Sequence, residues 1–171
     1  MRTATVDDAV AVIAVILDAG SMFRDADMAE VSDNPPPAVE DVEAQIQAGH
    51  IWVAAGDDRL VGCIVVRVVD GDAHIDQVST VRSHQGRGVG RRLVETAEDW
   101  ARAEGYARVT LTTFTDVSWN APYYRRLGYR ALEVDELGVE LAAARAEEAA
   151  FGLDAWGRCA MAHDLTGGPD R

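Results

Sequence analysis

Lysine is absent from this chain of 171 residues, and all 16 basic residues are arginines. Schiff-base catalysis needs a lysine amine and a Walker phosphate loop ends in a Gly-Lys pair, so the sequence excludes both. Acidic residues outnumber basic ones by 29 to 16, which gives a formal net charge of −13. A duplex nucleic acid is bound by neutralising its phosphates, so this charge argues against a nucleic-acid partner.

Cysteine is scarce and long apolar runs are missing. Cys63 and Cys159 lie in apolar stretches, which predicts buried free thiols in a reducing compartment rather than a disulfide. The longest apolar run, residues 9–17, is about half a membrane span and follows two aspartates instead of a basic segment. The four histidines show no ligand spacing with acids or cysteines, so we expect no metal site. We therefore expect a soluble, cytoplasmic protein with no membrane partner.

Hydrophobic periodicity indicates an α/β chain. With no repeat and no long linker, we expect a single domain over residues 1–165 and a short tail over 166–171. The pattern predicts strands at 2–6, 51–55, 60–69, 74–81, 109–113, 129–134 and 158–165, and helices after 7 or 8 and at 39–48, 88–104, 120–127 and 137–151. Short turns join the second to fourth strands, and a helix crosses between the fourth and fifth. This order predicts a mixed sheet with one locally parallel pair.

A glycine-rich turn, Gln85-Gly86-Arg87-Gly88-Val89-Gly90, separates the fourth strand from the helix that follows. Glycines let the backbone approach a ligand, and successive N–H groups at a helix start bind anions. Four of the 16 arginines fall within positions 82–92. The dinucleotide fingerprint fails, because Arg91 stands where its third glycine is required. The pattern indicates a site for a phosphate-bearing ligand, and the alternative is a glycine turn before a solvated helix.

This turn resembles the Q/R-x-x-G-x-G/A acyl-CoA pyrophosphate loop of the GNAT superfamily of N-acyltransferases. The segment from Asn120 to Tyr129 resembles the family's N-x-P-x-Y-x-x-x-G-F/Y element, and Arg2 to Asp8 resembles its N-terminal R-x-A-x-x-x-D start. The resemblance implies the GNAT fold, a mixed and mostly antiparallel sheet of about seven strands flanked by helices. It also implies that the sheet splays at its central parallel pair and that the protein uses acetyl-CoA as cosubstrate, without a metal.

The resemblance also implies how acetyl-CoA is held. The main chain of the strand before the turn would pair with pantetheine, and the N–H groups of the turn would bind the pyrophosphate. Asn120 would contact the pantetheine arm, and the alternative for this residue is a helix N-cap. The residues expected to bind acetyl-CoA are Val78, Ser79, Thr80, Val81, Gln85, Gly86, Arg87, Gly88, Val89, Gly90, Arg91, Asn120 and Tyr124.

Acetyl transfer to an amine needs a base, because an amine of pKa about 10.4 is neutral in about one molecule per thousand at pH 7. His74 and Asp76 are two residues apart on one predicted strand, so they share a face. They precede Gln85 by eleven and nine positions, where similar GNAT enzymes carry a base. We favour Asp76 acting through water, with His74 second. The alternatives are a surface position for His74 and a cross-strand partner for Asp76.

Tyr124 stands at the family's tyrosine position and would protonate the leaving thiolate or donate a hydrogen bond to it. The oxyanion would accept a hydrogen bond from a backbone N–H near Val78. The expected reaction is direct transfer of an acetyl group from acetyl-CoA to a primary amine in a ternary complex. The alternative is a catalytically silent acyl-CoA sensor or interaction module of the same fold.

Acidic residues dominate two segments that build the acceptor pocket in this family. They are Asp25, Asp27, Glu30, Asp33, Glu133, Asp135 and Glu136. Their charge predicts a cationic small-molecule or peptide acceptor, and a solvated acidic surface is the alternative. The Ala- and Glu-rich helix expected over 137–151 packs on the sheet in one interpretation and forms a homodimer surface in the other.

Overall fold

The structure is a computed structural model that describes residues 1–165, and the predicted tail over 166–171 lies outside them. Seven strands are hydrogen-bonded in the order β1-β2-β3-β4-β5-β7-β6, with turns between β2, β3 and β4 and helices in the other connections. The chain folds into two compact units, one made of Met1–Val66 and Gln77–Ala97 and the other of Arg67–Asp76 and the residues from Glu98 onward. The expectation that 1–165 form one domain stays a prediction.

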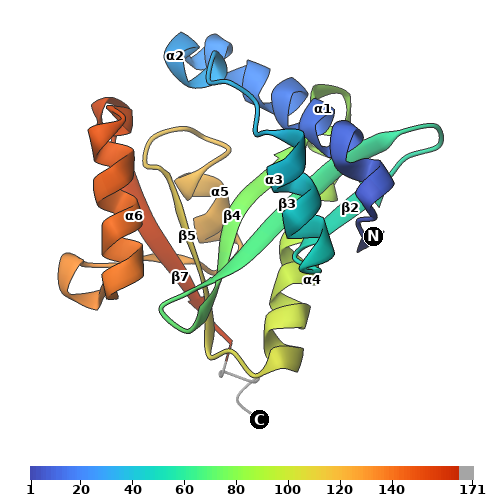
Figure 1. The fold of residues 1–171 in the computed structure, drawn as a ribbon. Coiled ribbons are helices and arrows are strands. Elements are labelled where there is room, and N and C mark those ends of the chain that lie inside the picture. The colour runs from blue at the N-terminus through green and yellow to red at the C-terminus, as the bar shows by residue number, and fades with distance from the viewer. Residues whose placement is uncertain (166–171) are drawn as a thin grey trace. The chain divides into compact units, whose positions relative to one another are not determined.

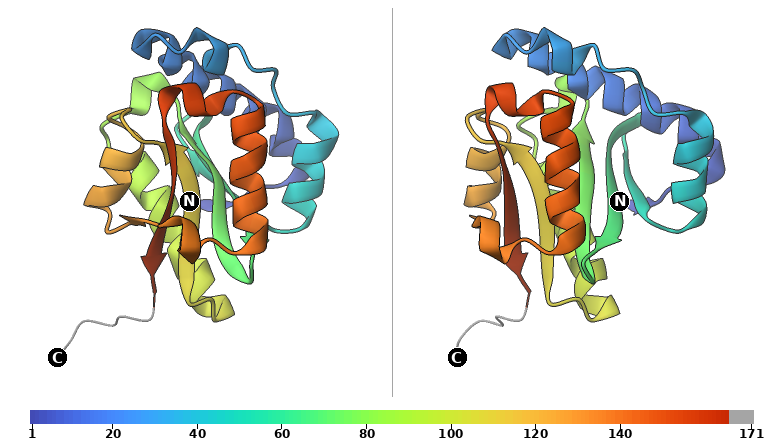
Figure 2. Two further views of the ribbon diagram at one scale, coloured as in Figure 1. Left: turned by 90° about the vertical axis from the view of Figure 1, so that its left-hand side faces the viewer. Right: turned by 60° about the vertical axis from the view of Figure 1, so that its left-hand side comes forward.

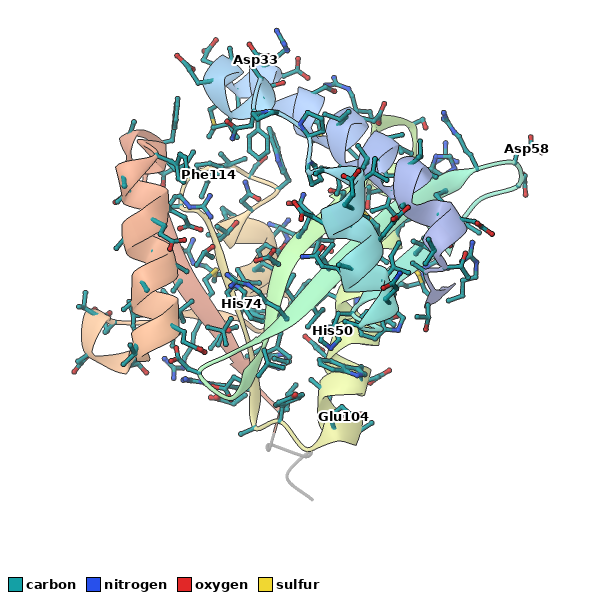
Figure 3. All side chains as sticks on the ribbon, in the orientation of Figure 1. Asp33, His50, Asp58, His74, Glu104 and Phe114 are labelled. Atoms are coloured by element: carbon teal, nitrogen blue, oxygen red, sulfur yellow. The ribbon has the colours of Figure 1, made fainter. Side chains whose placement is uncertain are left out.

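The first unit holds the N-terminal helices and strands. Its elements are β1 (Arg2–Thr3), η1 (Val6–Asp8), α1 (Ala9–Gly20), η2 (Ser21–Ala26), α2 (Ala29–Ser32), α3 (Val39–Gln47), β2 (Ile51–Ala55), η3 (Arg82–His84) and parts of β3 (Leu60–Val69), β4 (Asp72–Thr80) and α4 (Val89–Glu104). Helices α1 and α3 lie side by side (Figure 1). Strand β2 pairs antiparallel with both β1 and β3, and Asp58 marks the tip of the β2–β3 hairpin (Figure 3). The hairpin has the predicted bounds.

The start of α4 is packed directly against β3. A Cβ atom on Gly62 of β3 would lie 2.9 Å from the Val89 side chain and 3.0 Å from that of Leu93, so only glycine lets the helix approach this closely. Val89 and Leu93 are buried at the same time, since four residues of helix return to the same face. This packing fixes the position at which the chain passes from the glycine-rich turn into α4.

The second unit contains the later strands and α6. Its remaining elements are β5 (Arg108–Phe114), α5 (Ala121–Arg126), β6 (Arg130–Ala131), η4 (Val134–Glu136), α6 (Val139–Ala150), η5 (Leu153–Trp156) and β7 (Arg158–Asp164). Strand β4 pairs with β5 in parallel at 73–75 and 109–111, which confirms the predicted parallel pair. Strand β7 pairs antiparallel with β5 and β6. The splay beyond the parallel pair stays a prediction.

Helix α6 runs along the sheet beside β5 and β7 (Figure 2). Glu148 of α6 accepts hydrogen bonds from the Thr112 hydroxyl (2.5 Å) and the Arg158 guanidinium (2.8 Å). Burial raises the pKa of Glu148, but the hydrogen bonds from Arg158 and Thr112 outweigh it, so the pKa is lowered and the carboxylate stays charged. These contacts anchor α6 to the sheet.

The prediction of a strand over 129–134 is wrong for most of this range, because strand β6 is limited to Arg130–Ala131. These two residues pair with β7, the Leu132 N–H still donates to the Ala160 carbonyl of β7 (2.9 Å), and η4 begins at Val134. The Glu136 carboxylate accepts the Glu133 N–H (2.9 Å) and an Arg130 N–H (2.8 Å). A local turn thus takes the backbone groups that a longer strand would have paired.

Candidate active site

The glycine-rich turn opens α4 with backbone amides that have no helical partner. Gly86 and Gly88 have positive φ angles of 71° and 77°, which L side chains rarely adopt, and a Cβ on either would meet no other atom within 4 Å. The first hydrogen bond of α4 runs from the Arg92 N–H to the Gly88 carbonyl (3.1 Å). The N–H groups of residues 89 and 90 therefore have no acceptor within the helix. Together with the helix dipole, they form a cradle suited to an anion.

Two of the four arginines around the turn are paired with acids. Arg82 contacts Asp25 (2.6 Å) and Arg91 contacts Glu95 (2.8 Å). Arg87 and Arg92 are exposed and form no ion pair with any residue of 1–165. The positive charge left for an anionic ligand is thus concentrated on Arg87 and Arg92 rather than spread over all four.

The segment that ends α1 and forms η2 is tied to the same turn. The Asp18 carboxylate accepts the Arg82 backbone N–H (2.7 Å), and the Gln85 side-chain amide contacts the Met22 sulfur. Of the acids proposed to attract a cationic acceptor, Asp25, Asp33 and Glu136 are already paired with arginines. Asp27 and Glu30 take part in no ion pair within the described residues.

Strand β4 presents the predicted pantetheine segment with alternating orientation. The Val81 N–H donates to the Val61 carbonyl of β3 (3.0 Å), so Val81 and Ser79 direct their backbone groups toward β3. By the same alternation, Val78 and Thr80 direct theirs toward the opposite edge of β4. An N–H from Val78 is therefore on the edge where the sequence predicts pantetheine and the oxyanion donor.

His74 is buried within β4 at 2% exposure, so its alternative as a surface residue is wrong. Figure 3 labels His74 on the sheet. Its Nδ1 lies 2.8 Å from the Thr110 hydroxyl oxygen, and that hydroxyl donates to the Ala73 carbonyl (3.4 Å). The Thr110 hydroxyl thus holds the His74 ring through its Nδ1. Burial, with a smaller contribution from Arg67, lowers the pKa of His74 to about 4, so the ring is neutral at pH 7.

Asp76 lies two residues further along β4 and is exposed. Its Oδ1 accepts from the Arg67 Nε at 2.9 Å, so Asp76 is a cross-strand partner, as the alternative for this residue held. The other carboxylate oxygen lies outside this hydrogen bond. The pairing leaves the role of Asp76 as a base a prediction, and any proton it takes passes to the oxygen not held by Arg67.

Tyr124 is on the buried side of α5, at 8% exposure. Burial raises the pKa of its phenol above the ordinary value, with Tyr123 adding to the effect, so the hydroxyl is protonated at neutral pH. Within residues 1–165 this hydroxyl has no hydrogen-bond partner. Tyr124 therefore holds a proton that it is free to donate.

Asn120 occupies the N-cap position of α5, but its side chain makes no capping hydrogen bond. Its Nδ2 is buried and has no partner among the described residues. A buried amide nitrogen without an acceptor costs free energy, so this atom fits a ligand carbonyl such as those of pantetheine. Asn120 therefore stands at the N-cap position, as the alternative for this residue predicted, but its side chain does not cap the helix.

A buried cluster that the sequence analysis did not single out adjoins Tyr124. Glu98 of α4 is 7% exposed and accepts hydrogen bonds from Tyr129 and His163. The sequence did indicate that Glu98 is buried, because Glu98 follows Val94 by four residues and precedes Ala101 by three. Both neighbours are buried, so an acid on this stripe had to face the interior.

The cysteines offer no nucleophile of ordinary reactivity. Cys63 is buried, and burial raises the pKa of its thiol to about 12. Cys159 is half-buried rather than buried as predicted, and burial raises its pKa as well. Within residues 1–165 no group of His, Cys, Asp and Glu side chains is arranged to hold a metal ion. None of the described helices is both long and apolar enough to cross a bilayer.

The mixed sheet and the anion cradle are features of a nucleotide- or phosphate-binding α/β scaffold, and comparison with known proteins names the family. The model of the acetyltransferase (GNAT) family matches residues 20–129. The chain belongs to this family.

Curated relatives match over part of their length. Probable N-acetyltransferase 14 of Danio rerio is 30% identical over 95 residues, which are 54% of this chain and 34% of that protein. The uncharacterized N-acetyltransferase YesJ of Bacillus subtilis is 24% identical over 117 residues, covering 60% of this chain and 65% of that protein. The chain thus spans about one third of the length of the first relative and just under two thirds of the length of the second.

Solved structures share the fold at low identity. The PaiA N-acetyltransferase of Thermoplasma acidophilum, in complex with coenzyme A, has a TM-score of 0.67 at 13% identity, covering 95% of this chain and 96% of that one. The ribosomal-protein-S18-alanine N-acetyltransferase of Escherichia coli has a TM-score of 0.66 at 14% identity, covering 99% and 96%. Identities this low show the fold alone, which is the predicted GNAT fold.

Proposed function

We propose that this protein transfers an acetyl group from acetyl-CoA to a primary amine by direct attack in a ternary complex. The observation that carries the proposal is the pair of unpartnered backbone amides at 89 and 90, opened by Gly86 and Gly88 and flanked by Arg87. Such a pair suits a diphosphate, and coenzyme A carries one. The unpartnered Nδ2 of Asn120 supports a second contact, to the pantetheine arm.

The proposed reaction needs one residue that donates a proton and one that accepts a proton. The amine nitrogen attacks the thioester carbonyl carbon, the C–S bond breaks and coenzyme A leaves as a thiolate. Tyr124 donates its phenolic proton to that sulfur, and the attacking nitrogen gives a proton to a base. Solvent returns a proton to Tyr124, so acetylated amine and free coenzyme A are the only products. The Val78 N–H is the proposed donor to the tetrahedral oxyanion.

For the base we propose Asp76 acting through water, with His74 as the second candidate. Asp76 is exposed and has one carboxylate oxygen outside the Arg67 contact. His74 is neutral and can accept a proton, but it is buried. The pH dependence of kcat/KM distinguishes them: Asp76→Asn abolishes the acidic limb if Asp76 is the base, and His74→Asn does so if His74 is.

The acceptor is proposed to be a small-molecule or peptide amine. The unpaired carboxylates Asp27 and Glu30 support a cationic one. We further propose that the protein acts in the cytoplasm. Fewer carboxylates are left for a substrate than the sequence suggested, because Asp25 and Asp33 are paired with arginines. The electrostatic attraction of a cationic acceptor then rests on the carboxylates that remain unpaired.

The proposal is tested by measuring thiol release from acetyl-CoA with spermidine, kanamycin, glutamate and an alanine-initiated hexapeptide as acceptors. Calorimetric titration with coenzyme A is run alongside. We expect binding of coenzyme A and faster thiol release with at least one amine than with water. Binding without turnover on any amine would instead favour the silent acyl-CoA sensor, and absence of binding would contradict both functions.

A further inference from the structure

Glu98 is a buried carboxylate whose partners fix its position. Its Oε1 accepts from the Tyr129 hydroxyl (3.1 Å) and lies 3.0 Å from the His163 Nδ1. Its Oε2 lies 3.6 Å from an Arg102 guanidinium nitrogen, one helical turn further along α4. A buried acid without such partners would be strongly destabilising. Glu98 is therefore a fixed acceptor around which Tyr129 and His163 are ordered.

Tyr129 connects this acceptor to Tyr124. The two rings pack edge to face, with centroids 5.6 Å apart and planes at 65°. The Tyr129 N–H also donates to the Tyr124 carbonyl (3.0 Å). On its other side Tyr129 packs against the His163 ring at 5.2 Å. Tyr129 is thus held by backbone, ring packing and its hydroxyl, while Tyr124 is held by ring packing and backbone alone.

Gly128 lies beside His163 in this cluster. Gly128 has a φ of 96°, and a Cβ there would lie 3.4 Å from the His163 Nε2. Burial and the charge of Glu98 raise the pKa of Tyr129, so its phenol remains a hydrogen-bond donor. The ring of Tyr129 therefore keeps one orientation as long as Glu98 accepts the hydrogen bond from its hydroxyl.

We propose that Glu98 and Tyr129 are positioning residues for Tyr124: Glu98 holds the Tyr129 ring, and that ring fixes the direction of the Tyr124 hydroxyl. This inference rests on the proposed role of Tyr124 as proton donor to the thiolate. Neither Glu98 nor Tyr129 touches a reacting atom in this account. Their contribution is to orientation, which matters because small misplacements of a catalytic group slow the chemical step.

The test is a double-mutant cycle. Glu98→Gln and Tyr129→Phe are each made in the wild type and in Tyr124→Phe, and kcat and KM for acetyl-CoA are measured with the fastest amine of the panel. We expect each single change to lower kcat roughly tenfold, with KM within about twofold. In the Tyr124→Phe background neither change should lower kcat further, because the group they orient is gone. Asp99→Asn is the matched control, an exposed acid on the same helix that contacts Arg102 (2.9 Å), and it should keep the wild-type kcat.

The outcomes separate this inference from the proposed function. Unchanged kcat in both single variants, or the same loss of kcat with and without the Tyr124 hydroxyl, overturns the positioning role alone. An unchanged kcat in Tyr124→Phe removes the proton donor itself and takes this inference with it. Tyr129→Phe keeps the ring and removes one oxygen, so it carries the test if Glu98→Gln fails to fold.

Discussion

At the scale of single residues, burial keeps the phenol of Tyr124 protonated and the imidazole of His74 uncharged, both in the second unit. Removal from water disfavours the charged form of any group, so it raises the pKa of the Tyr124 phenol and lowers that of His74 to about 4. At neutral pH the phenol therefore holds its proton and the imidazole is uncharged. The same physical effect thus suits one residue to donating a proton and the other to accepting one.

Replacing Tyr124 with phenylalanine tests the donor directly. We expect Tyr124→Phe to lower kcat roughly a hundredfold, as loss of a general acid does. The calorimetric Kd for coenzyme A should stay at the wild-type value, because the amides at 89 and 90 are untouched. Tyr106→Phe, which removes the same oxygen from a ring packed on Trp100, is the control. Equal kcat for wild type and Tyr124→Phe would exclude Tyr124 from proton transfer.

The low pKa of His74 has a consequence for stability. Its value of about 4 in the folded chain lies below the ordinary 6.5, so the unfolded chain binds the proton more readily. The free energy of unfolding is thus fully retained above about pH 6.5 and falls toward pH 4, by at most about 1.4 kcal/mol per pH unit. His74→Asn keeps a polar partner for Thr110 and removes the titration. Urea unfolding between about pH 6.5 and 5 should show a shallower pH dependence in His74→Asn, and an unchanged slope contradicts the assignment.

At the scale of elements, α6 begins where a distant turn caps it. Gly138 stands at the N-cap and has no side chain to offer. The Asp70 carboxylate, from the β3–β4 turn, accepts the N–H groups of Glu140 and Leu141, both at 2.9 Å. The Glu140 carboxylate in turn accepts the Asp70 N–H. This reciprocal arrangement joins the turn to the helix across 70 residues of sequence.

Asp70→Asn should weaken this cap without changing the backbone. Asparagine tolerates the φ of 53° at this position but leaves one of the two helix N–H groups without an oxygen. We expect the free energy of unfolding to fall by about 1 kcal/mol in urea denaturation. Asp27→Asn is matched in backbone, with a φ of 57°, and should cost less than about 0.5 kcal/mol. Equal losses from both variants would show that the cap contributes nothing.

The elements that sequence periodicity predicted best are those whose burial is regular. Strands β2 and β3 have the predicted bounds, and α4 starts one residue later than expected. Strand β6 is much shorter than predicted, because Glu136 folds back on Glu133 within the same segment. The α6 cap and the His74–Thr110 contact were beyond prediction, since both depend on residues brought together only by the tertiary fold.

For the site, local motifs gave the glycine turn, Asn120 and Tyr124, because each motif is contiguous in sequence. The state of each side chain was not predictable in this way. Arg82 and Arg91 belong to the basic cluster in sequence, yet each is paired with an acid in the structure. Asp76 is likewise held by Arg67. Charge counts along a sequence do not show which charges cancel.

At the scale of the whole molecule, a chain of formal charge −13 is proposed to bind an anionic cosubstrate. Salt of physiological strength screens exposed charges beyond roughly 8 Å, so the net charge repels coenzyme A only weakly at a distance. Affinity must then come from groups in contact with the diphosphate. The amides at 89 and 90 and the unpaired Arg87 are the groups that the account assigns to this task.

Calorimetric titration with coenzyme A of the wild type, Gly88→Asn and Gly105→Asn tests this assignment most directly. Gly88 and Gly105 have φ angles of 77° and 84°, and a Cβ on either meets no protein atom within 4 Å, so the backbone cost of asparagine is matched. The account predicts that Gly88→Asn raises the Kd at least roughly tenfold, because its side chain enters the anion cradle, while Gly105→Asn, beyond the other end of α4, binds as the wild type does. A Gly88→Asn variant that binds coenzyme A with wild-type affinity would contradict it.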